Sequence, residues 1–135
     1  MRYTEDNGIY AICLEAGEEL VFTLTNFCKE KKIEGGFFHG IGASDDLEIG
    51  YRSLVTKDYL SKRFSGCVFE ITNLTGNVSK ERLHIHITIG DSDMKAYTGH
   101  LISANVNPTL EVFLTPFKTL TRKMDEASGL ALLDL

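Results

Sequence analysis

The sequence contains little that would direct a protein to a membrane or out of the cell. Its 135 residues include no apolar run long enough for a membrane span. The first residues, Met1 to Asn7, are polar, so we expect no secretory signal. The three cysteines, Cys13, Cys28 and Cys67, are an odd number, lie far apart and form no C-x-x-C pair. Because each lies in an apolar pattern, we predict buried, reduced thiols and a cytoplasmic protein.

Positive charge is also scarce. Lys and Arg number 14 against 19 Asp and Glu, so the formal net charge is −5. Nucleic-acid-binding proteins usually carry a positive footprint, because phosphate contacts dominate their affinity. Two basic clusters, one at Lys29, Lys31 and Lys32 and one at Arg122 and Lys123, would have to converge on one face of the assembly to bind DNA. Charge balance at a helix end already explains the first cluster. The AT-hook core Arg-Gly-Arg-Pro is absent, so direct, sequence-specific DNA binding is poorly supported.

One amphipathic helix is predicted after the first strand. Glu18 and Glu19 begin it and lysines close it, which complements the helix dipole, and Gly35-Gly36 is expected to stop it. Its apolar residues recur with a period of 3.6 and are Leu20, Val21, Leu24, Phe27 and Cys28.

The rest of the chain has the patterns of β-strands separated by short turns. Turns are predicted at 75–77 and 90–93. With no internal repeat, low-complexity tract or linker, we expect one α+β domain over residues 1–135, with a mostly antiparallel sheet and a packed helix. The tail, 118–135, ends in apolar residues and is expected to dock on the body or on a neighbouring subunit. Strands are predicted at 9–14, 37–43, 47–51, 55–59, 67–71, 82–89, 97–106 and 110–114.

Three of the four histidines lie between positions 84 and 100. Residues i and i+2 of a strand point to the same face, so His84 and His86 should project side by side. A turn centred on Ser92 would pair residues whose numbers sum to 184. That register places His84 opposite His100 and His86 opposite Thr98. A connection one residue longer or shorter would send His100 to the other face.

Three imidazoles that converge from a rigid sheet are the usual protein half of a catalytic-type zinc site with an open fourth position. Neutral imidazole binds zinc, copper, iron or nickel, and we predict zinc at His84, His86 and His100. The alternative is that these are surface or hydrogen-bonded histidines that share no ligand. The H-x-H pattern with a third histidine on the adjoining strand favours the metal cluster.

Other residues carry weaker signals. Glu70 lies within an apolar strand; it is a candidate general base if it faces the histidines, and a solvated strand residue or ion-pair partner if it does not. The Gly40-Ile41-Gly42 segment follows a helix and enters a strand, the reverse of a dinucleotide-binding loop, so close packing or a bulge is favoured. His39 is a possible fourth ligand but fits a turn or surface position better. Cys67 is expected to be an inert thiol.

Ordered motifs over residues 8–114 resemble the plants and prokaryotes conserved (PPC) domain, a family associated with DNA-binding proteins. The motifs are Gly40-Ile41-Gly42-Ala43, Phe69-Glu70-Ile71, Leu74-Thr75-Gly76-Asn77, His84-Ile85-His86, Thr88-Ile89-Gly90-Asp91, Gly99-His100-Leu101 and Glu111-Val112. Where the family often has Gly-Gly-His-Leu, this chain has Thr98 before Gly99. In the predicted register Thr98 would face His86 and could narrow the site.

The resemblance implies an antiparallel sheet with a packed helix, assembled as a homotrimer. In plants the domain accompanies AT-hooks in nuclear DNA-binding proteins, whereas prokaryotic members are often the bare domain. Many of these carry H-x-H and a later histidine that can bind a metal, here His84, His86 and His100. Three functions stay open: a trimeric zinc protein with a small-molecule pocket and hydrolytic or lyase-type chemistry, a DNA-associated regulator, and a non-catalytic interaction module.

Overall fold

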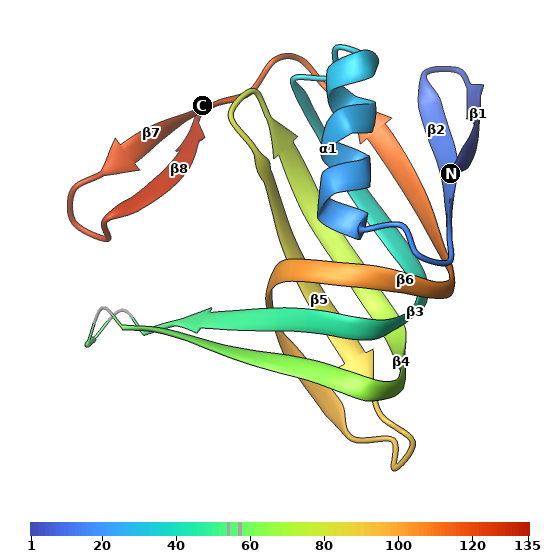
Figure 1. The fold of residues 1–135 in the computed structure, drawn as a ribbon. Helices are drawn as coiled ribbons and strands as arrows, with labels where there is room; N and C mark the ends of the chain where they lie inside the picture. Colours follow the sequence, from blue (N-terminus) through green and yellow to red (C-terminus); the bar gives the residue numbers. More distant parts are fainter. Residues whose placement is uncertain (54, 57) are drawn as a thin grey trace.

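The protein is described by a computed structural model that covers residues 1–53, 55–56 and 58–135. Most of it is β-structure, with one helix in these ranges (Figure 1). The elements are β1 (Arg2–Asp6), β2 (Ile9–Glu15), α1 (Leu20–Glu30), β3 (Gly35–Arg52), β4 (Tyr59–Ser79), β5 (Leu83–Gly90), β6 (Ala96–Pro116), β7 (Thr121–Asp125) and β8 (Leu130–Asp134).

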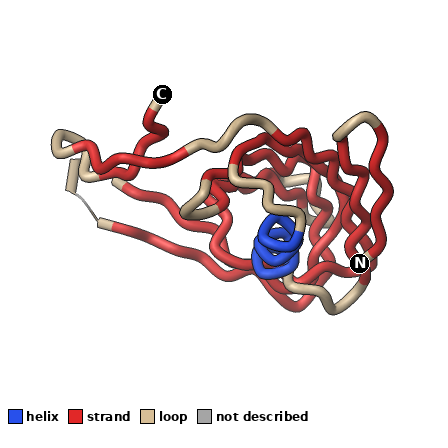
Figure 2. The backbone as a smooth tube through the Cα atoms, turned by 90° about the horizontal axis from the view of Figure 1, so that it is seen from above, coloured by secondary structure: helices blue, strands red, loops and turns tan. Residues whose placement is uncertain are grey.

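The main sheet has six strands in the order β1-β2-β6-β3-β4-β5, and every neighbouring pair is antiparallel. The long strand β6 also pairs with β5 through its first residues, while its later residues pair with β2 and β3. The sheet therefore curls until its edge strand β5 meets the first residues of β6. Helix α1 lies inside this curl (Figure 2). The predicted antiparallel sheet with a packed helix is confirmed.

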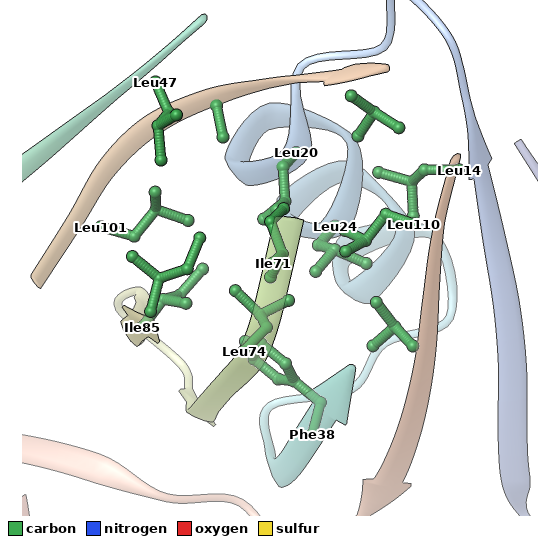
Figure 3. Close-up of a cluster of buried hydrophobic side chains, with 14 of the residues drawn as sticks. Leu14, Leu20, Leu24, Phe38, Leu47, Ile71, Leu74, Ile85, Leu101 and Leu110 are labelled. Atoms are coloured by element: carbon green, nitrogen blue, oxygen red, sulfur yellow. The ribbon is translucent and has the colours of Figure 1, made fainter. Parts of the chain in front are cut away.

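The core fills the space between the helix and the inner face of the sheet (Figure 3). Alternation along β5 shows how the sequence selects this face: Ile85, Ile87 and Ile89 are all at most 2% exposed, while the residues between them point outward. The helix contributes Leu20 and Leu24, which are fully buried. The largest buried side chains elsewhere are Leu14, Phe38, Leu47, Ile71, Leu74 and Leu110.

The helix begins where the sequence predicts but ends earlier. Glu19 is its N-cap, and the Glu19 carboxylate accepts a hydrogen bond of 2.6 Å from the Phe22 N–H. Lys31 caps the C-terminus and Lys32 takes the left-handed conformation, with φ of 56°. The prediction that Gly35-Gly36 stops the helix is wrong. Both glycines begin β3, where a Cβ on Gly36 would lie 2.7 Å from the Thr115 carbonyl oxygen.

Several strands are longer than predicted. The segments expected at 37–43 and 47–51 are one strand, β3, and those at 97–106 and 110–114 are one strand, β6. The predicted turn at 75–77 is wrong because β4 continues to Ser79. Gly76 serves packing there, since a Cβ on it would lie 2.5 Å from the Phe38 ring. The strand expected at 55–59 includes Lys57, which lies outside the described residues; Val55 is in a turn and Tyr59 begins β4.

Two hairpins project from the same side of the curled sheet (Figure 2). One is the outer part of β3 and β4, and the other is β7 with β8, which form a sheet of their own. Their ends are neighbours, because a Cβ on Gly129 would lie 3.3 Å from an Arg52 guanidinium nitrogen. Where the tail leaves the body, the Lys80 N–H donates to the Leu120 carbonyl.

The cysteines do not share one environment. All three are free, but only Cys28 is buried; Cys13 is half-buried and Cys67 is exposed. Burial raises the pKa of the Cys28 thiol to about 11. The prediction of buried thiols therefore holds only for Cys28. Cys67 lies in the irregular part of β4 between Ser65 and Phe69, where β4 has no paired residue on β3, and its side chain is exposed. In the described ranges, no helix has the length and apolarity needed to cross a membrane.

Candidate metal centre

The histidines are positioned by β5 and β6. Because Ile85 and Ile87 point into the core, His84 and His86 point to the outer face of the sheet. On β6 the core residue Leu101 places the preceding His100 on that same face. All three predicted ligand residues therefore share one face, as the parity of the hairpin requires.

The predicted register itself is wrong by two residues. His86, not His84, lies opposite His100, and Thr98 lies opposite Thr88. The physical reason is the turn, which is centred on Asp93 rather than on Ser92. There the Asp91 carboxylate accepts hydrogen bonds from the N–H groups of Asp93 and Lys95 at 3.0 and 2.9 Å, which fixes a five-residue connection.

The corrected register gives Thr98 a different role from the one predicted. It does not face His86. Its hydroxyl lies 3.2 Å from that of Thr88 and donates a hydrogen bond of 3.0 Å to the Ile87 carbonyl. Thr98 therefore ties β6 to β5 immediately before His100, and it does not narrow the space between the histidines.

The three imidazoles converge. One ring nitrogen of each of His84, His86 and His100 lies within 4.8 Å of the others, and the ring centroids are 5.1, 5.2 and 5.7 Å apart. Ligands held about 2.0–2.1 Å from a tetrahedral metal are roughly 3.4 Å apart. Small side-chain rotations would bring the three nitrogens to that spacing, so the donor set and its geometry fit a metal ion.

Burial favours the neutral form of two of these rings, His84 and His100. It lowers the pKa of His84 to about 4, with the neighbouring His100 and His86 rings and the guanidinium groups of Arg122 and Arg82 acting in the same direction. The pKa of His100 is also lowered, first by burial and then by His86 and Arg82. Neutral rings have the free nitrogen lone pairs that a metal needs.

Arg122 belongs to this site although no motif indicated it. Its Nε donates to the Ser79 hydroxyl at 3.1 Å, its Nη1 donates to the Ala131 carbonyl at 2.9 Å, and its Nη2 donates to the Asn77 side-chain oxygen. Asn77 is the cross-strand partner of His84. The sequence suggested only a short basic cluster at Arg122-Lys123. The contact arises because the tail returns to the end of β4.

A family model, described as the Plants and Prokaryotes Conserved (PCC) domain, matches residues 1–118. The chain belongs to this family. It is the family whose motifs the sequence resembles, and that prediction is confirmed. The match ends where the chain enters the projecting β7–β8 hairpin.

Solved structures share the PCC-domain fold of this chain. A candidate DNA-binding protein from Bacteroides thetaiotaomicron is 36% identical, with a TM-score of 0.92 over 98% of this chain and 96% of that one. A metal-containing protein from Archaeoglobus fulgidus is 33% identical, with a TM-score of 0.83 over 98% and 97%. The bifunctional protein GlmU from Synechococcus is 25% identical over 125 residues, which are 90% of this chain and 19% of that protein. The chain thus spans about a fifth of that relative.

Two other candidates of this PCC domain lie away from the histidines. Glu70 is exposed on the outer face opposite Gly90, four residues along β5 from His86 and therefore about 13 Å away. His39 shares the row of His86 but lies two strands across, and its ring stacks on Phe113 at 5.9 Å. The structure brings neither to the cluster.

The glycine segment on β3 has the packing role that was favoured. The β3–β4 register shifts between Gly40 and Gly42, and a Cβ on Gly40 would lie 2.5 Å from the Glu111 carbonyl oxygen. These glycines let β3 and β6 approach closely, and no phosphate loop forms.

Two cavities lie near the site. One, of about 260 Å³, is lined by Gly50, the cross-strand partner of His100, by Thr98, and by the aromatic residues Phe64 and Tyr97. The other, of about 230 Å³, lies between the end of α1 and the β4–β5 turn and includes Arg82. No histidine lines either cavity; the first borders the cluster through Gly50, which pairs with His100.

Proposed function

We propose that this PCC domain binds a divalent metal ion, with zinc as the first candidate, through His84, His86 and His100. One observation carries the proposal: three imidazoles converge on one outer face, each with a ring nitrogen within 4.8 Å of the others. The 33%-identical protein from Archaeoglobus fulgidus is described as metal-containing, which supports the proposal. Three histidines leave one coordination position for water or a small ligand. A zinc ion there would supply Lewis acidity.

Metal content tests this proposal directly. Protein purified without a histidine tag is expected to hold close to one equivalent of metal by elemental analysis, and His84→Ala is expected to lose it. His39→Ala is the matched control, because it removes a histidine of the same outer face that stacks on Phe113 instead of joining the cluster. Less than about a tenth of an equivalent in the wild type after incubation with zinc, or equal content in the wild type and His84→Ala, would contradict the proposal.

The proposed small-molecule pocket is the 260 Å³ cavity that begins at Gly50 and Thr98. Its lining combines apolar surface from Ile49 and Phe64 with the Lys62 ammonium group, which lies 4.8 Å from the Phe64 ring centroid. Ligand sites commonly pair apolar walls with a few polar groups. No general base is assigned, because Glu70 lies about four β5 residues from the nearest histidine.

We also propose the homotrimer that the family resemblance implies, with residues 1–135 as one domain. Large apolar side chains of the outer sheet face support self-association: Phe37, Ile41 and Phe113 are 56%, 60% and 50% exposed in the single chain. The tail hairpin also exposes Leu132, at 47%, which would suit docking on a neighbouring subunit. Light scattering coupled to size exclusion tests this: a monomeric mass at micromolar concentration would contradict it.

DNA association is a second candidate because the 36%-identical protein from Bacteroides thetaiotaomicron is described as a candidate DNA-binding protein. The net charge of −5 opposes it. A mobility-shift titration at several salt concentrations distinguishes the two cases. Binding that weakens steeply with salt supports phosphate contacts, and no shift at low salt excludes this function.

A further inference from the structure

Two guanidinium groups lie beside the histidine cluster. Arg82 is two residues before His84, and both Arg82 and Arg122 act electrostatically on His84. Arg122 reaches the cluster through Asn77, which pairs with His84 across the strands. Asn77 and His84 lie on adjacent antiparallel strands, which are about 4.8 Å apart, so the Arg122 guanidinium is hydrogen-bonded to the residue directly beside His84.

Arg122 is half-buried without a carboxylate partner among the described residues. Its three hydrogen-bond acceptors, on Ser79, Ala131 and Asn77, are all neutral oxygens. Glu81 influences Arg122 through space but forms no ion pair with it. A partly buried arginine is normally paired, because removing its charge from water is costly. Burial lowers the pKa of Arg122 for this reason, because it disfavours the charged guanidinium.

The Arg122 guanidinium has more N–H donors than it has acceptors among the described residues. A guanidinium has five N–H donors in a planar fork, and the neutral acceptors of Arg122 take one each from Nε, Nη1 and Nη2. Each terminal nitrogen therefore retains one N–H that has no acceptor among the residues that the structure describes. Such a fork is suited to the two oxygens of a carboxylate or a phosphate.

A metal ion would increase the excess of positive charge beside the histidines. The imidazoles of His84, His86 and His100 bring no negative charge to a dication, and the nearby ionised side chains that act on His84 are the cations Arg82 and Arg122. An anion bound in the open coordination position would offset the positive charge of both the ion and the arginines. Neutral ligands would leave the positive charges facing one another at short range.

We propose that the ligand of the histidine site is a small oxyanion, carrying a carboxylate or a phosphate, that contacts the metal and the Arg122 guanidinium together, with Arg82 adding positive charge at the rim. This inference rests on the proposed function, because the metal is one of its two anchors. Arg122 is thereby assigned as a ligand-binding residue, held in orientation by Ser79, Asn77 and Ala131.

Cobalt(II)-loaded protein provides the test, because changes in coordination alter its visible spectrum. Acetate, inorganic phosphate and the neutral acetamide are titrated separately. We expect a saturable change with acetate or phosphate and none with acetamide; the stronger of the two anions identifies the headgroup. Arg122→Gln is expected to weaken anion binding about ten- to a hundredfold, the value of a hydrogen bond to a charged group, without weakening cobalt binding.

Matched variants keep the result interpretable. Lys123→Gln removes the neighbouring exposed charge of β7 and is expected to bind the anion like the wild type. Arg82→Gln alters an exposed side chain and is expected to weaken the anion severalfold even if Arg122→Gln proves poorly folded by circular dichroism. Cobalt binding with equal anion affinity in the wild type, Arg122→Gln and Arg82→Gln overturns the inference, as does an equal response to acetamide.

Failure of the metal proposal gives a different result. If cobalt does not bind, acetate and phosphate are titrated into the metal-free protein and followed by the NMR signal of the Arg122 side-chain N–H. A saturable shift that is absent with acetamide then retains the anion site on the arginine alone. No shift overturns the anion site together with the metal.

Discussion

The lowered pKa values of His84 and His100 make the metal-free protein sensitive to mild acid. His84 has a pKa of about 4 in the folded chain and about 6.5 when unfolded. Between these values the unfolded state binds the proton and the folded state does not, so stability falls as pH decreases. From pH 8 to pH 5 the linkage gives a loss of about 2 kcal/mol. Because the ring is only half-buried, solvent screening reduces the expected loss to about 1 kcal/mol.

Urea denaturation at pH 8 and pH 5, with chelator present, measures this loss. A change of 1 kcal/mol moves the urea midpoint by about 0.5 M. His84→Gln replaces the ring with a neutral side chain of similar size that cannot take up a proton. Because every other titrating group is common to both proteins, the difference between their pH dependences isolates His84, and its coupling to His100, whose pKa is lowered in the same direction.

The reasoning has a clear point of failure. If the wild type and His84→Gln lose the same free energy of unfolding between pH 8 and pH 5, His84 is not held neutral by the fold. A direct titration of the His84 ring by NMR checks the cause independently. We expect its midpoint near 4, and a midpoint near 6.5 would refute the burial argument.

Three further predictions concern the framework of the site. Leu74→Ala removes a fully buried side chain and is expected to cost about 2–5 kcal/mol in urea unfolding; a loss below 1 kcal/mol would mean that this part of the core can collapse. Glu19→Ala removes the acceptor of the Phe22 and Ala104 N–H groups and should lower the free energy of unfolding by about 1–2 kcal/mol. Full stability of Glu19→Asp would show that the length of this side chain is unimportant. Gly99→Ala would place a Cβ against the Ile49 side chain and the Gly50 backbone, so we expect at least tenfold weaker zinc binding; unchanged affinity would show that β6 can shift without moving His100.

The outer-face location of the histidines could be predicted because strand alternation has a period of two. The isoleucines at positions 85, 87 and 89 select the core face, which leaves His84 and His86 no other direction. The helix position followed equally from its 3.6-residue period. Both features depend on residues a few positions apart, so the sequence displays them directly.

The register and the arginine contact depend on information that spacing does not contain. The turn moved by one residue because the Asp91 carboxylate accepts two backbone N–H groups, a local choice among several that the turn sequence permits. Arg122 and Asn77 are 45 positions apart, and they meet only because the tail returns across the end of β4. The continuous strands β3 and β6 were mistaken for pairs because Ser44-Asp45-Asp46 and Asn107-Pro108 resemble turn residues. Gly76, which serves close packing within β4, was mistaken for a turn glycine for the same reason.

The pairing of β5 with β6 ends at the rung that joins His86 to His100. Beyond this rung β6 turns away to pair with β3, where Leu101 lies opposite Ile49, while β5 continues beside β4. The two strands therefore fork at the histidines, with His84 on the β5 branch. An ion bound by all three rings would hold β5 and β6 together at this fork, where the curled sheet closes on itself. Slower hydrogen exchange of the backbone amides around the fork would then report occupancy of the site, even with no reaction taking place.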